Sequence, residues 1–159
     1  MKPHRVSAVL PDDRLPRADW ADRYEIDVPG GCLTPIQAAG RTLGHAPSWV
    51  RRLLALRNRI VSLFGLKGAE MRMGEKNAVG VFPVLSQGDK EAVLGFDDSH
   101  LDFRIVVDVR PNGSSGQTVG VTTLVFRKNL FGRVYIAAIT PFHRLIVRTL
   151  LSGLARSPA

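Results

Sequence analysis

Cysteine is almost missing from this chain, which holds Cys32 as the single thiol among its 159 residues. One thiol excludes an internal disulfide framework and any metal site built from several thiolates. Cys32 follows two glycines and has no charged neighbour in that tripeptide, so we interpret it as a small loop or buried thiol and not as a nucleophile. The chain also has no phosphate-binding glycine loop after a strand, no His-Glu-x-x-His and no Gly-x-Ser-x-Gly segment. The motifs therefore predict no metal and no cofactor, and whether the protein is an enzyme stays open.

Acidic residues are missing from two long stretches, residues 28–69 and residues 109–159. The formal net charge is +8, and cations gather in the same two stretches. Such a surface attracts anionic lipid or other polyanions, but it is also typical of a basic soluble domain, which we take as the simpler interpretation. The aromatic residues occupy core-like positions, so no specific nucleic-acid partner is predicted and contact with an anionic membrane is expected to be weak. The cations are Arg41, Arg51, Arg52, Arg57, Arg59 and Lys67 in the first region and Arg127, Lys128, Arg133, Arg144, Arg148 and Arg156 in the last.

No apolar run near the amino terminus is long enough for a signal peptide, because residues 6–10 lead directly into Pro11. The longest apolar stretch is residues 130–159, and the basic residues spaced through it disfavour a membrane span. We therefore expect a cytoplasmic protein with one core. Its predicted parts are an irregular arm over residues 1–19, a single domain over residues 20–154 and a tail over residues 155–159.

The remaining patterns predict helices and strands in a definite order. Residues 20–28 alternate between apolar and charged side chains, as in a half-buried strand. Thr34 followed by Pro35 is typical of a helix start and opens a short helix, and a second helix is predicted over about residues 47–64. Four strand-like runs then form an antiparallel meander over residues 79–86, 91–97, 101–110 and 117–127.

The last thirty residues predict one long helix that is too apolar to stay in water alone, so it must pack on the preceding sheet. The element order predicts an α+β fold in which a curved antiparallel β-sheet wraps around a long C-terminal helix, with two short helices after the first strand. Pro141 removes one helix hydrogen bond, so we expect it to kink this helix and widen the gap to the sheet.

The hairpin over residues 91–110 separates apolar from charged side chains. A two-residue turn at Asp98-Ser99 would pair Asp97 with His100 and would put His100 on the charged, outer face. The dense group Asp97, Asp98, His100 and Asp102 could suggest a metal or acid/base site, but at a solvated turn these residue types are ordinary. We prefer a structural interpretation of this group.

Two polar residues fall among apolar helix positions. Arg57 lies within the apolar stripe of the second helix, so it must snorkel, pair with a buried acid or face a cavity. His143 is predicted on one side of the terminal helix, where a satisfied core or edge histidine is more common than a ligand contact. Its predicted neighbours there are Ile139, Phe142, Ile146 and Leu150. A ligand is expected in the gap between this helix and the sheet.

Several segments resemble a family of bacterial domains of unknown function over about residues 18–152. The most specific are the Asp-Asp-x-His-Leu-Asp-Phe-Arg hairpin at residues 97–104 and the Pro-Phe-His-Arg helix at residues 141–144. The family looks like a branch of the START-like (helix-grip, SRPBCC) superfamily. The resemblance implies a curved sheet that encloses an apolar cavity with its last helix, and it implies no catalytic residues.

The sequence therefore predicts that a small apolar molecule or lipid binds in a cavity between the sheet and the C-terminal helix. Two alternatives stay open: a cyclase- or hydrolase-type enzyme with His143 as acid/base, and an interaction module whose basic helices dock on anionic lipid or nucleic acid. The oligomeric state stays open between monomer and homodimer. The residues predicted to line the pocket, with Arg57 and His143 as polar anchors, are Trp49, Leu53, Arg57, Phe82, Leu94, Phe96, Leu101, Phe103, Phe142, His143 and Ile146.

Overall fold

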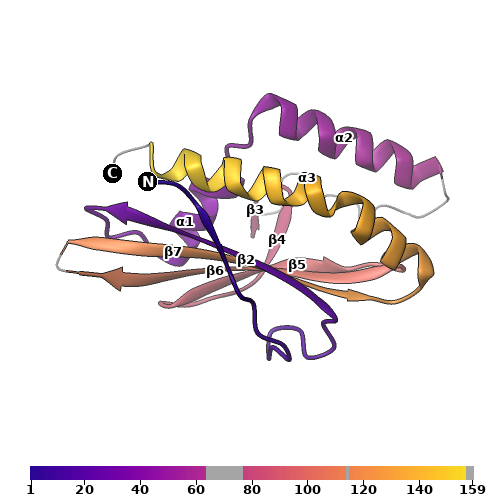
Figure 1. The fold of residues 1–159 in the computed structure, drawn as a ribbon, viewed down its shortest axis with the longest axis horizontal. Helices are drawn as coiled ribbons and strands as arrows, with labels where there is room; N and C mark the ends of the chain where they lie inside the picture. Colours follow the sequence, from indigo (N-terminus) through magenta and orange to yellow (C-terminus); the bar gives the residue numbers. More distant parts are fainter. Residues whose placement is uncertain (64–76, 114, 157–159) are drawn as a thin grey trace.

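The computed structural model describes residues 1–63, 77–113 and 115–156, and of Arg57, Ile60 and Val61 it describes the backbone alone. Within these residues a curved antiparallel sheet carries a long C-terminal helix and two shorter helices on one side, which confirms the predicted α+β fold (Figure 1). The elements are β1 (His4–Val6), β2 (Trp20–Pro29), α1 (Pro35–Leu43), α2 (Ser48–Leu63), β3 (Ala78–Val79), β4 (Phe82–Gln87), β5 (Glu91–Asp97), β6 (Leu101–Asn112), β7 (Gly116–Arg127) and α3 (Leu130–Leu154).

The sheet has the strand order β1-β2-β7-β6-β5-β4-β3. The predicted meander forms β4 to β7, and β2 joins it beside β7, with Trp20 opposite Val125 and Val28 opposite Gln117. Successive side chains of a strand point to opposite faces, so Tyr24 and Ile26 both lie on the face that packs beneath α3. β2 therefore contributes to the core although it is only one strand from the edge of the sheet.

The predicted register of the β5–β6 hairpin is wrong. Asp97 pairs with Asp102 and Phe96 with Phe103, because the turn lies at Ser99-His100, where the Asp98 N–H donates to the Leu101 carbonyl at 2.9 Å. The centre of the turn therefore lies one residue later than predicted, and each pairing moves by two residues, which keeps the predicted apolar face together. His100 precedes β6, so strand alternation does not apply to it.

The short helix α1 begins as predicted. The Thr34 hydroxyl accepts a hydrogen bond from the Gln37 N–H, and the Gln37 side chain accepts one from the Thr34 N–H. This reciprocal capping box satisfies two amide groups that the first turn leaves free. Pro35 follows at the first helical position, where its missing N–H is harmless.

The helix α2 is farther from the sheet than α3 in Figure 1. Val50 in its first turn is buried, whereas Leu56 and Leu63 are exposed. Among the described side chains of this helix, only Val50 of the predicted stripe is therefore fully buried. Phe64, the predicted last residue, lies outside the described residues.

The helix α3 begins at Asn129, whose side chain accepts a hydrogen bond from the Gly132 N–H at 2.9 Å. Pro141 stands inside the helix without ending it, and the ribbon bends between its orange and yellow halves in Figure 1. The side chains buried against the sheet recur at helical spacing, so one stripe of the helix holds the core together. They are Ile136, Val147, Leu150, Leu151 and Leu154.

The amino-terminal arm is more ordered than predicted. Its residues 4–6 form β1, and Leu15 is buried on the outer face of the sheet against Val93, Val106 and Leu124. Arg14 donates to Glu91 at 2.6 Å and ties the arm to β5. Residues 1–19 therefore pack as part of the domain predicted to begin at residue 20.

Candidate functional site

Five side chains from three distant segments meet beneath the middle of α3; we name them the Asp22 cluster. They are Arg5 of β1, Trp20 and Asp22 of β2, and His143 and Arg144 of α3. Arg5 lies opposite Tyr24 in the sheet, so its side chain is on the same inner face as Asp22. The cluster thus lies at the β1 edge of the sheet.

Asp22 is an ionisable residue placed among core positions, and its side chain has no exposed surface. Arg5 Nε donates to Asp22 Oδ1 at 2.6 Å, and Arg144 Nε lies 3.7 Å from Asp22 Oδ2. A buried carboxylate needs such cations, since an unpaired charge in the core would be strongly unfavourable. The side chains of Arg5 and Arg144 are 52% and 43% exposed, so the cluster reaches from the core to the surface.

Three buried polar atoms of the Asp22 cluster have no hydrogen-bond partner in the protein: Asp22 Oδ2, His143 Nε2 and Arg144 Nε. Buried polar groups in folded proteins are nearly always hydrogen-bonded to protein or to ordered water. An acceptor, a donor and an imidazole nitrogen in one place can together satisfy a polar group from outside the chain, or water.

The imidazole of His143 is a neutral base in this environment. Burial lowers its pKa below the ordinary value, the negative charge of Asp22 opposes this, and Arg144 adds to the lowering. The Trp20 ring stands edge-on to the imidazole, with 5.5 Å between ring centroids, and holds it in place. A neutral imidazole can accept or donate a hydrogen bond, as a polar anchor must.

An apolar cluster borders these polar groups. Leu101, Val125 and Ile136 form its buried part, and Trp20 and Ile139 pack against it. The Asp22 cluster therefore joins a charged, partly exposed edge to an apolar interior, which suits a molecule with one polar end.

The second buried histidine, His100, was predicted on the outer, solvated face, and that prediction is wrong. The side chain of His100 is fully buried between β6 and the first turns of α3, in edge-on contact with Phe131 and Tyr135. Its Nδ1 lies 3.4 Å from a carboxylate oxygen of Asp98. The one-residue shift of the turn explains the error, because His100 folds under α3 instead of following the strand.

The acidic residues around this turn have structural partners. Asp97 pairs with Arg104 at 2.7 Å, and Asp102 pairs with Lys128 at 2.6 Å. Within the described residues no group of three or more His, Cys, Asp or Glu side chains could hold a metal ion. The ion pair between Asp102 and Lys128 therefore connects the start of β6 to the segment that leads into α3.

Five of the eleven predicted lining residues do come together on the inner face of the sheet. Phe103 is central, because its ring contacts Phe82 and Phe96 with centroid distances of 5.8 and 4.3 Å. Leu94 is buried in the main core cluster, and Leu101 in the cluster beneath Ile136. These five residues form one apolar layer.

The other predicted lining residues are scattered. Phe142 is 55% exposed on the side of α3 that faces away from the sheet, so the structure does not bring it to the apolar layer. Ile146, Trp49 and Leu53 are partly buried and belong to none of the apolar clusters formed by the described residues. The side chain of Arg57 lies outside the described residues.

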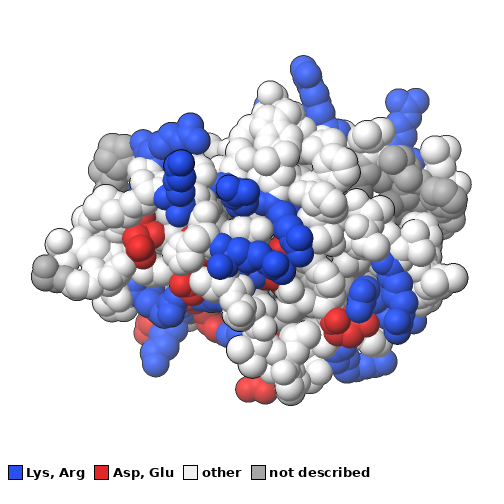
Figure 2. Space-filling model, viewed as in Figure 1, with Lys and Arg blue, Asp and Glu red and all other residues white. Residues whose placement is uncertain are grey.

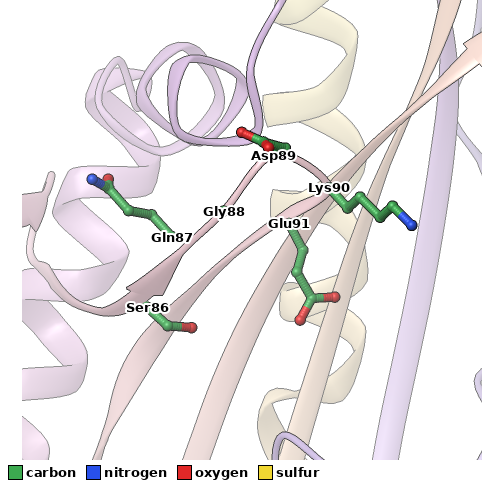
Figure 3. Close-up of a pocket in the computed structure, with 6 residues that line it drawn as sticks. All are labelled: Ser86, Gln87, Gly88, Asp89, Lys90 and Glu91. Atoms are coloured by element: carbon green, nitrogen blue, oxygen red, sulfur yellow. The ribbon is translucent and has the colours of Figure 1, made fainter.

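A surface hollow of about 450 Å³ lies at the β4–β5 turn (Figure 3). It is lined by six consecutive residues, from Ser86 to Glu91, and Figure 3 shows their side chains pointing apart. Glu91 is engaged by Arg14, so no group of free polar atoms converges there. The Asp22 cluster is the better candidate for a binding site, because its buried polar atoms lie close together and have no hydrogen-bond partner in the protein.

Sequence reasoning predicted only His143 of the Asp22 cluster and missed the other four members, Arg5, Trp20, Asp22 and Arg144. Asp22 carries a signal that could have found it, since it falls in phase with Tyr24 and Ile26 on the apolar side of its strand. Arg144 was grouped with the solvent-facing Arg148, although it lies at the flank of the helix and reaches Asp22. Arg5 had no local signal, because a three-residue strand is specified by its distant partner.

The fold and the Asp22 cluster define an α+β protein whose curved antiparallel sheet holds a long helix over a buried carboxylate and an imidazole. The chain belongs to a family described as "Protein of unknown function (DUF2867)", which matches residues 14–150. The resemblance to a family of domains of unknown function is confirmed at that level. No curated protein and no solved structure matches the chain.

Proposed function

We propose that the protein binds a small, mainly apolar molecule with one polar or anionic group, at the Asp22 cluster between β2 and α3. The observation that carries the proposal is the set of three buried polar atoms that have no hydrogen-bond partner in the protein, on Asp22, His143 and Arg144. A ligand group that carries donors and acceptors would satisfy these atoms together, as one buried water could, and the binding experiment below separates the two.

The charges favour a neutral or anionic polar group over a cationic one. Two guanidinium groups, of Arg5 and Arg144, surround the single carboxylate of Asp22. The neutral imidazole adds no negative charge. A carboxylate or sulfonate on the ligand would balance the charge of the second guanidinium group, and a hydroxyl would add a hydrogen bond without changing the charge.

The apolar part of the ligand would lie against Trp20 and Ile139, which continue the cluster of Leu101, Val125 and Ile136. Contact with a tryptophan ring and branched aliphatic side chains supplies most of the affinity of such sites. A fatty acid or an aromatic acid has this combination of groups. The proposal includes membership of the chain in the START-like superfamily, in which apolar ligands lie between the sheet and the last helix.

Anilinonaphthalene sulfonate tests the proposal, because it joins an apolar ring system to one anionic group. We expect one probe molecule to bind per chain. In the variant W49F, where Trp20 is the remaining tryptophan, we expect fluorescence energy transfer from Trp20 to the bound probe. Arg144→Ala and His143→Ala are each expected to weaken binding about tenfold, the loss of one hydrogen bond to a charged group. Decanoate should compete with the probe.

The matched controls are Arg148→Ala and His45→Ala, which remove exposed residues of the same types. Phe142→Ser tests whether the probe adsorbs nonspecifically to the exposed side of α3 instead of binding at the Asp22 cluster. Unchanged affinity in both Arg144→Ala and His143→Ala, or a loss of binding in Phe142→Ser alone, would show that the Asp22 cluster is not the site.

A second candidate function, a cyclase- or hydrolase-type reaction, is favoured by one observation. His143 Nε2 is buried and has no hydrogen-bond partner in the protein, so it is free to exchange a proton with a bound molecule, as a general acid or base must. Mass spectrometry of the molecules that co-purify with the wild type and with His143→Ala separates the two candidates. Conversion by the wild type with accumulation of the unconverted molecule on the variant would indicate catalysis, and identical molecules on both would indicate binding alone.

A further inference from the structure

The side of α3 that faces away from the sheet is unusually apolar for an exposed surface. Its residues recur at the spacing of one helical face, and Leu130, Val134, Phe142 and Leu145 are each more than half exposed. Ala137, Ala138 and Pro141 fill the positions between them and are exposed as well. A soluble domain normally places polar side chains on such a face.

The helix α2 also exposes an amphipathic face. Arg51, Arg52 and Arg59 alternate at helical spacing with Leu56 and Leu63, and all five side chains are exposed. An arginine-rich face that contains exposed leucines is typical of helices that lie in the interface of a lipid bilayer.

Positive charge is concentrated on the side of the molecule where α2 and α3 lie. Figure 2 shows many of the Lys and Arg side chains over the helices, while most of the acidic side chains in this view lie lower, over the sheet. The sequence explains this, since residues 28–69 and 109–159 contain no Asp or Glu. Arg133 and Arg148 are exposed within the apolar face of α3 itself.

Among the described helices α3 is long and apolar enough to span a membrane by length and composition, a test that core helices of soluble proteins also pass. Only 17% of its most apolar window is buried inside the molecule, so α3 is not an ordinary core helix. Its opposite stripe is fixed to the sheet through Leu150, Leu151 and Leu154, which requires the helix to lie along a bilayer surface and not across it.

We infer that the exposed faces of α2 and α3 dock on an anionic lipid bilayer, with the leucines and Phe142 inserted among the acyl chains and the arginines on the phosphate groups. The combination of positive charge and exposed apolar side chains favours an anionic bilayer over the other possible partners. A second copy of the chain would bring two basic faces without acidic residues together, which is repulsive. A nucleic acid would match the arginines but leave the apolar side chains without a partner.

Vesicle flotation tests the inference with the whole protein. The protein should float with vesicles of three parts phosphatidylcholine and one part phosphatidylglycerol, should bind pure phosphatidylcholine weakly, and should be released as the salt rises from about 0.05 to about 0.5 M. The double variant R51E/R52E and the double variant F142S/L145S are each expected to lower the partition coefficient by at least about tenfold. All four positions are exposed, so the fold should be retained, as circular dichroism would verify.

The matched controls K90E and L85S change exposed residues of the same types on β4 and its turn, and both should bind vesicles like the wild type. His143→Ala should also bind normally, which separates this surface from the ligand site. Equal binding to neutral and anionic vesicles, unchanged binding of F142S/L145S, or a lipid-free dimer that F142S/L145S dissociates would each overturn the inference.

Discussion

At the scale of single residues, the fold depends on how buried charge is compensated. Asp22 occupies a strand position whose neighbours on the same face, Tyr24 and Ile26, are core residues. The structure tolerates it because Arg5 and Arg144 bring positive charge from the sheet edge and from α3. His143 in the same place remains neutral because burial disfavours its charged form.

The lowered pKa of His143 predicts a specific dependence of stability on pH. The unfolded chain binds a proton on this imidazole at about pH 6.5, whereas the folded chain binds it only at a lower pH. Stability is therefore at its full value above about pH 6.5, the pKa of the unfolded chain, and it is lost as the pH falls from there through the pKa of the folded state. We expect urea unfolding to show a larger loss of stability between about pH 7.5 and pH 5 for the wild type than for His143→Gln.

The control for this experiment is His45→Gln, because His45 is exposed and its removal should leave the pH dependence unchanged. Asp22→Asn gives an independent readout, since the loss of its negative charge should move the His143 titration observed by NMR to still lower pH. Equal pH dependence in the wild type and His143→Gln would contradict the assigned environment.

At the scale of elements, the position of α3 is set at its first turn. The Asn129 side chain caps the helix, and His100 packs between Phe131 and Tyr135. Gly132 is required here because a Cβ on it would lie 2.3 Å from the His100 carbonyl oxygen, which belongs to the backbone and cannot move aside. The β5–β6 turn and the helix can approach this closely only at a glycine.

Gly132→Ala and Gly153→Ala should therefore have opposite effects, although both glycines lie inside α3. Helix propensity alone favours alanine by up to about 1 kcal/mol at either position. A Cβ on Gly153 would meet no atom within 4 Å, so that variant should be stabilised by about 0.5 to 1 kcal/mol. Gly132→Ala should be destabilised by about 2 kcal/mol or more through overpacking, as measured by urea unfolding. Stabilisation of both variants would show that the contact with His100 is absent in solution.

At the scale of the whole molecule, the two faces of the sheet are covered by different means. The helices cover the inner face, and the arm before β2 covers part of the outer face through Leu15. The same arm supplies β1, which protects the edge of β2, and Arg5, which neutralises Asp22. The arm is thus needed for the core, for the sheet edge and for the candidate site.

Deletion of residues 1–17 is accordingly expected to make the protein aggregate, because it exposes the cluster of Val93, Val106 and Leu124 and the edge of β2. The single change Leu15→Ala should retain the fold and lose about 2 to 3 kcal/mol of stability. Light scattering on heating and thermal unfolding measure the two effects. A chain that begins just before His4 keeps β1 and serves as the control; aggregation of that chain to the same extent would refute the role of the arm.

The local patterns of this chain determined its elements and the faces they present. Thr34-Pro35, the alternation of β2 and the apolar stripe of α3 act over a few residues, where dihedral preference and period decide the outcome, and those predictions are confirmed. The tertiary structure alone decided which side chains meet at the Asp22 cluster, that His100 lies under α3, and that Phe142 faces outward. These depend on contacts between segments as far apart as β1 and α3, because a one-residue shift of a turn or a small rotation of a helix moves a side chain between core and solvent without changing the local pattern.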